Sequence, residues 1–157
     1  MFTDVKRFVD FMIKNEINER QFLLCYLLHA DLEIINGKKY YESSYANSER
    51  PISSIYKLTN LEVLHISSNK MSGTISASIA NLTKLNILSF FDNSMYGKLP
   101  TEIGNLVNLK ELALANNLFE GAIPSQLSKL LKLEILLLND NRLSGTINES
   151  IKTLPLL

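Results

Sequence analysis

A repeat of 24 residues constrains the fold of this chain more than any other feature of its sequence. Leucines and glycines recur at this interval without a slip, and four complete units run from Leu58 to Thr153. Self-similarity at such a period is typical of a solenoid, in which each unit packs only against its neighbours and about three units suffice for stability. The glycines that mark the period are Gly73, Gly97, Gly121 and Gly145.

Each unit reads L-x-x-L-x-x-L-x-L-x-x-N-x-L-x-G-x-I-x-x-x-I-x-x. The Leu-x-Leu core predicts a short strand whose alternate side chains point inward, and we expect successive strands to form a parallel sheet. The asparagine after each strand is also expected to point inward, where its amide can satisfy backbone groups of neighbouring turns. This predicted structural asparagine ladder consists of Asn69, Asn93, Asn117 and Asn141.

These residues resemble the leucine-rich repeat family. The stretch NNLFEGAIPSQLSKLLKLEILLLNDN is similar almost throughout to the 24-residue, plant-specific type of repeat, and the resemblance covers residues 51–157. It implies an α/β fold, namely a right-handed leucine-rich-repeat solenoid with a parallel β-sheet on its concave face. Proline follows the apolar residue only at Pro100 and Pro124, whereas Ser76 and Asn148 replace it. The second short strand of this repeat type is therefore less strongly expected in the first and fourth units.

The first part of the chain lacks the repeat. Residues 1–50 are expected to form a helical N-terminal cap or a small helical domain, which precedes the solenoid of residues 51–157. Apolar residues at helical spacing predict two helices there. Asn36-Gly37 predicts a turn or the end of the second helix, and residues 38–50 are expected to form a connection.

The last part of the sequence stops four residues into a fifth unit, so partial end units flank the four full repeats. No polar cap follows, although an exposed terminal coil presents apolar surface and an unpaired strand edge. We expect the chain to be a fragment of a longer array. Coverage of this end by another chain, or termination of the stack by Pro155, are the alternatives.

Composition and charge exclude several classes of function. The 16 basic side chains balance 16 acidic ones, so the chain is not a polycation suited to nucleic acid. One cysteine and two histidines supply neither an internal disulfide nor a metal cluster, and no cofactor or metal is expected. No apolar stretch is long enough to span a membrane, and no signal-peptide core precedes the repeats. The chain is therefore predicted to be cytoplasmic.

Candidates for catalysis are few. His65 could lie near Ser67, Ser68 and Ser89 on the sheet, in an arrangement that nucleophilic catalysis would need. The sequence indicates no carboxylate on a neighbouring strand that would orient His65, and serine is an ordinary solvent-facing strand residue. We therefore predict no catalytic residues and expect a protein that is not an enzyme.

The outward positions of the strands are expected to carry the function, because the framework determines only the inward ones. Exposed apolar residues beside a mildly acidic rim favour a protein or peptide ligand on the concave face, with Phe91 as the anchor. Strand propensity alone is the other explanation for the aliphatic residues. The predicted partner-binding residues are Val63, His65, Ser67, Ile87, Phe91, Asp92, Glu111, Asn116, Ile135, Leu137, Asn139 and Asp140.

Two other functions stay open from the sequence. Basic residues of the helical N-terminal unit could contact the phosphates of a nucleic acid, although the interleaved acidic residues cancel most of the positive field. Self-association through the uncapped C-terminal repeat would instead make the chain an assembly subunit.

Overall fold

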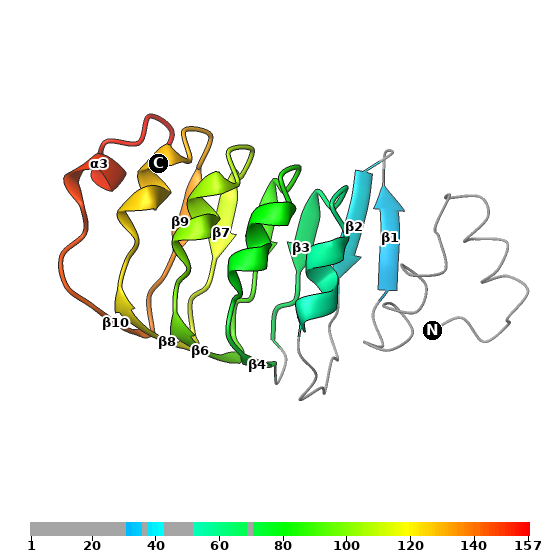
Figure 1. The fold of residues 1–157 in the computed structure, drawn as a ribbon, viewed down its shortest axis with the longest axis horizontal. Helices are drawn as coiled ribbons and strands as arrows, with labels where there is room; N and C mark the ends of the chain where they lie inside the picture. Colours follow the sequence, from blue (N-terminus) through cyan, green and yellow to red (C-terminus); the bar gives the residue numbers. More distant parts are fainter. Residues whose placement is uncertain (1–30, 36–37, 43–51, 69–70) are drawn as a thin grey trace, which may run out of the picture.

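The computed structural model describes residues 31–35, 38–42, 52–68 and 71–157, which form a stack of coils along one axis (Figure 1). Each coil from β3 onward contributes one strand to a first sheet and one to a second sheet. The first sheet contains β1 (Asp31–Ile35), β2 (Lys38–Glu42), β3 (Val63–His65), β5 (Ile87–Ser89), β7 (Glu111–Ala113) and β9 (Ile135–Leu137). The second sheet contains β4 (Ser72–Gly73), β6 (Ser94–Lys98), β8 (Leu118–Ala122) and β10 (Arg142–Ser144).

The strands of the repeat pair in parallel, as predicted, and residues 24 apart are in register: Val63 lies opposite Ile87, followed by Glu111 and Ile135. In the second sheet, β6 and β8 have five residues each, whereas β4 has two and β10 has three. The second strand is thus present in all four units and shorter in the two that lack the proline.

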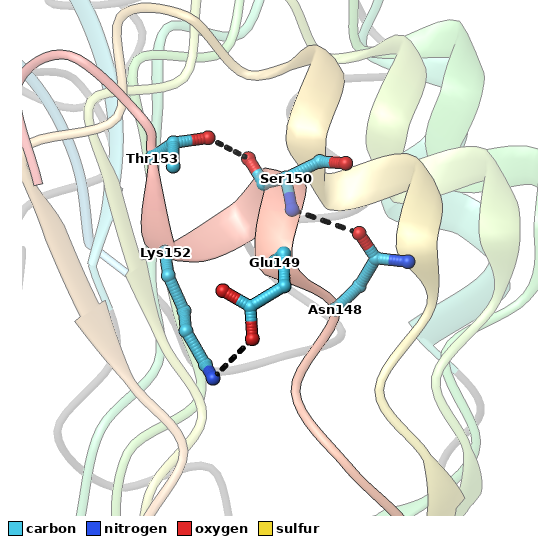
Figure 2. A network of polar contacts seen from close by, with 5 residues as sticks. All are labelled: Asn148, Glu149, Ser150, Lys152 and Thr153. Atoms are coloured by element: carbon cyan, nitrogen blue, oxygen red, sulfur yellow. Dashed lines mark hydrogen bonds and ion pairs between the residues drawn. The ribbon is translucent and has the colours of Figure 1, made fainter.

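Short helices close the coils opposite the first sheet (Figure 1). They are the 3-10 helices η1 (Ile52–Lys57), η2 (Ala77–Asn81), η3 (Thr101–Asn105) and η4 (Ser125–Lys129) and the α-helix α3 (Glu149–Lys152). Pro100 and Pro124 precede η3 and η4 without a side-chain cap. Ser76, which replaces the proline in the first unit, accepts a hydrogen bond from the backbone N–H two residues on at 3.2 Å. Asn148 does the same in the fourth unit at 2.9 Å (Figure 2). These substitutions therefore cap their helices.

The inward side chains of the coils form one continuous core. Leu88, Leu112 and Leu114 are fully buried, whereas the equivalent Leu136 and Leu138 of the last coil are only partly buried. The difference arises because β9 has a neighbouring strand on one side only among the described residues.

Asparagine side chains bridge successive coils beside the strands. The backbone N–H of Met95 donates to Oδ1 of Asn117 at 2.9 Å, and Nδ2 of Asn117 donates to a carbonyl of the preceding coil at 2.7 Å. Asn93 and Asn141 make the equivalent pairs of bonds in their own coils. Asn69 lies outside the described residues.

The expected helical N-terminal cap is not confirmed. Its described part forms β1 and β2, an antiparallel pair separated by two residues in the sequence, and β2 continues the parallel sheet beside β3. Short runs rich in isoleucine and tyrosine, separated by Asn-Gly, favour a hairpin, and the pairing covers the edge of β3. The helices expected before residue 31, and the boundary expected at residue 50, lie outside the described residues.

Candidate binding surface

The concave face is the outward side of the first sheet, formed by the residues that alternate with the inward leucines of β3, β5, β7 and β9. Register pairing places these residues in rows that run across the strands. The first row is Val63, Ile87, Glu111 and Ile135, and the second is His65, Ser89, Ala113 and Leu137. Two residues further along each coil stand Ser67, Phe91, Ala115 and Asn139.

Exposed apolar surface is concentrated at one end of this face. Ile135 and Leu137 on β9 are 44% and 41% exposed, and Ile87 and Phe91 are partly buried. Val63 is only 8% exposed, so the expectation that it adds apolar surface is wrong. The physical reason is position, because Val63 lies between β2 and β5, whereas β9 is the last strand of the sheet. The apolar part of the face therefore runs from Phe91 toward β9.

The middle of the face carries small side chains. Ser89, Ala113 and Ala115 are at most 2% exposed, although they stand on the outward side of the sheet. Larger neighbours on the same face must therefore cover them. The Ser89 hydroxyl also lies 2.8 Å from that of Ser67. A buried serine bonded to another serine is not placed to attack a substrate, which removes Ser89 as a nucleophile.

His65 has an acidic residue beside it on the neighbouring strand, contrary to the expectation from the sequence. Its row was expected to contain no carboxylate-bearing neighbour, but Glu42 on β2 is the in-register partner of His65. Tyr40 likewise continues the first row beside Val63. These two positions were missed because residues 38–50 were interpreted as a connection. The signal that could have revealed them is the Asn-Gly dipeptide between two short β-prone runs.

The polar rim has a backbone explanation. Its four residues adopt left-handed conformations, with φ between 54° and 57°. Asparagine and aspartate tolerate this region better than most residues, so the polar character of this row follows from the backbone as well as from solvent. The rim residues are Ser68, Asp92, Asn116 and Asp140.

The charges of the concave face are one-sided. The coil segments 63–68, 87–92, 111–116 and 135–140 contain three carboxylates and no lysine or arginine, although the chain as a whole is neutral. The carboxylates belong to Asp92, Glu111 and Asp140. Asp140 accepts a hydrogen bond from the side chain of Asn139. Glu111 and Asp92 make no ion pair with any described residue.

Among the described residues, no cluster of three or more histidine, cysteine, aspartate or glutamate side chains could hold a metal ion. In the same part of the chain, no helix is long and apolar enough to cross a membrane. The basic residues on which the nucleic-acid alternative depends lie before β3, and most of them fall outside the described residues.

Comparisons with known proteins identify the family. The Leucine Rich Repeat model matches residues 60–82, 108–130 and 132–154. A comparison with curated protein sequences gave no match. Among solved structures, one chain of the BIR3–SERK2 complex from Arabidopsis thaliana is 31% identical, with a TM-score of 0.68, over 82% of this chain and 71% of that one.

Plant receptors are also similar. The peptide hormone receptor RGFR1, solved in complex with RGF2, is 31% identical and the TDR receptor 37% identical, both with a TM-score of 0.65. Each match covers 67% of this chain but only 17% and 18% of the respective receptor, so the chain spans less than a fifth of their length. Together with the periodic coils and the bridging asparagines, these matches show that the chain belongs to the leucine-rich repeat family.

Proposed function

We propose that the chain is a non-enzymatic binding module that recognises a protein or a peptide on its concave face. The observation that carries this proposal is the exposure of Ile135 and Leu137 on β9, on the same face of the sheet as the partly buried Phe91. Exposed apolar side chains next to a polar rim are a usual composition of a protein-binding surface. Strand propensity alone does not account for Phe91, because this residue lies two positions beyond the end of β5.

The structural relatives support a ligand of this kind. RGFR1 was solved with RGF2, PEPR1 with AtPEP1, and BIR3 with SERK2. These complexes contain peptide or protein partners. The matches cover only a short part of RGFR1 and PEPR1, so the identity of their ligands is not carried over to this chain.

The proposal can be tested with a paired variant. Phe91→Ala together with Leu137→Ala removes apolar area from the concave face without touching the inward leucines. We expect each substitution to weaken binding by about 1 to 3 kcal/mol, which is typical of residues at the centre of an interface. The measurement is a pull-down from a cell extract followed by mass spectrometry, after circular dichroism has verified the fold.

The second sheet offers a matched control. Tyr96 and Leu118 are 52% and 38% exposed and pair in register between β6 and β8. Changing both to alanine also removes one aromatic and one leucine side chain, but from the second sheet and not from the concave face. Partners lost only with the concave variant would support the proposal. Equal recovery of partner proteins with the concave variant and with the control variant would contradict it.

Self-association is a second candidate, favoured by one observation. Leu136, Leu138 and Leu143 are only partly buried, although their equivalents in the preceding coil are fully buried. Partly buried apolar side chains beside the strand β9 are suited to pairing with a second copy. Sedimentation over a range of concentrations tests this alternative: a dimer should dissociate in an Ile147→Lys, Leu156→Lys variant, whereas a concentration-independent monomer excludes it.

A further inference from the structure

We infer that the ligand of the concave face presents a lysine or arginine side chain close to an apolar one, with Glu111 binding the cation and Ile135 and Leu137 contacting the apolar group. This inference rests on the proposed function, because it concerns the chemistry of the ligand on the same face. It goes beyond that proposal by stating what the ligand must contain.

Acidic and basic side chains are distributed unevenly over the molecule. The chain has 16 basic and 16 acidic side chains, yet segments 63–68, 87–92, 111–116 and 135–140 hold three carboxylates and no lysine or arginine. The described lysines of the first sheet, Lys38 and Lys39, stand on β2, three strands from Glu111 on β7. Three lysines precede the strands, and each has a partner: Lys84 donates to Asn60, Lys132 donates to Asn108, and Lys110 pairs with Glu134 at 3.3 Å. These three lysines are therefore engaged, whereas Glu111 and Asp92 lack an ion-pair partner among the described residues. A cationic ligand would complement this field.

The second argument is the position of Glu111. Its in-register neighbours are Ile87 on one side and Ile135 on the other, and its side chain is partly buried. Apolar neighbours limit the access of water to a carboxylate, and a carboxylate without a partner in such a place gains more from an incoming cation than one in open solvent. Arginine or lysine would supply the missing charge-assisted hydrogen bond.

The distances from Glu111 to Ile135 and Leu137 also support this inference. Neighbouring strands lie about 4.8 Å apart and residues two apart on a strand about 6.6 Å, so Ile135 and Leu137 should lie within roughly 5 to 8 Å of Glu111. In an extended peptide, side chains two residues apart point the same way and are separated by about 6.6 Å. A basic residue and an apolar residue in an i, i+2 relation would therefore reach both parts of the surface at once.

The experiment uses a library of short random peptides displayed on phage and selected against the full chain. Synthetic versions of the selected peptides are then measured by fluorescence anisotropy against four proteins: the unmodified chain, Glu111→Gln, Glu120→Gln, and the Phe91→Ala, Leu137→Ala variant. Glu120 is the matched control, because it is an exposed glutamate on β8 of the second sheet. Both glutamine variants lose one negative charge and keep the side-chain shape.

We expect the selected peptides to be enriched in a basic residue two positions from an apolar one. Glu111→Gln should weaken their binding about tenfold, as for loss of a hydrogen bond to a charged group, whereas Glu120→Gln should leave it unchanged. Replacing the basic residue of the peptide by glutamine should abolish the difference between the unmodified chain and Glu111→Gln. Added salt should weaken binding to the unmodified chain more than to the variant.

The possible results separate the two proposals. Peptides that lose affinity for the Phe91→Ala, Leu137→Ala variant, but lack a basic residue or ignore Glu111→Gln, would overturn this inference and leave the proposed function standing. Peptides unaffected by the concave variant, or a selection that yields no binder, would contradict both.

Discussion

Replacing Asn117 by alanine tests how the coils are held together. Asn117 is 6% exposed, and its side chain makes four polar contacts: Oδ1 accepts from the backbone N–H of Met95, and the two N–H groups of Nδ2 are shared among three carbonyl oxygens. The three carbonyls belong to Phe90, Leu114 and Ala115. The variant removes all four contacts at a place that water reaches poorly.

The expected loss of stability in the Asn117→Ala variant depends on which hydrogen bonds remain. Each carbonyl keeps another donor, from Asn93, Asn141 and Asp92 respectively. The N–H of Met95 loses its acceptor, which costs about 1 to 3 kcal/mol for a buried group. The small cavity left by the amide adds to this loss. We therefore expect the free energy of unfolding to fall by about 2 to 4 kcal/mol, a large part of the 5 to 15 kcal/mol typical of a domain.

Asn141→Ala is the matched control. Asn141 makes the same four contacts in the last coil, accepting from Phe119 and donating to three carbonyls, but it is only partly buried. Water can replace part of what is lost there, so we expect a cost of about 1 kcal/mol. Urea unfolding followed by circular dichroism measures both, with the Asn117→Ala midpoint lower by about 1 to 2 M. Equal midpoints for the two variants would refute the reasoning.

Three further results are expected. Gly104→Ala should destabilise the fold by about 1 to 3 kcal/mol, because a Cβ there would clash with the carbonyl oxygen of Gln126; unchanged urea stability would contradict this contact. Phe90→Ala should lower the free energy of unfolding by about 3 to 5 kcal/mol, and Phe91→Ala, at the neighbouring outward position, should lower it much less. Similar urea midpoints for the two variants would contradict the alternation of inward and outward side chains. Burial raises the pKa of the Tyr56 hydroxyl above its ordinary 10.0, so the contribution of Tyr56 to stability should be fully present below about pH 10 and be lost above it; Tyr56→Phe should reduce this alkaline loss, as measured by urea unfolding at several pH values.

Much of the fold was predictable from the repeat. The 24-residue step places Leu88, Leu112 and the bridging asparagines at equivalent points of successive coils, and the structure has the strands in the same register. Local chemistry also accounts for the departures from proline, since Ser76 and Asn148 supply side-chain caps instead. Periodic sequence specifies periodic structure because each coil meets the same neighbours.

The candidate surface was harder to predict, because exposure depends on neighbours outside the repeat. Val63 has the same place in its unit as Ile135, but β2 covers one side of it and nothing in the repeat indicates that strand. Exposure to solvent is one reason for a polar residue at Asp92. Its left-handed backbone conformation, which favours aspartate, is a second reason. Neither feature can be derived from spacing alone.

Binding on the concave face is the central claim, and backbone amide chemical shifts test it most directly. The measurement is a titration of the isotopically labelled chain with a ligand recovered by the pull-down or the peptide selection. The account predicts perturbations in residues 87–92, 111–116 and 135–140, strongest around Glu111 and Leu137. Perturbations confined to β6, β8 or α3 would contradict it, since those elements lie on other sides of the coils (Figure 1).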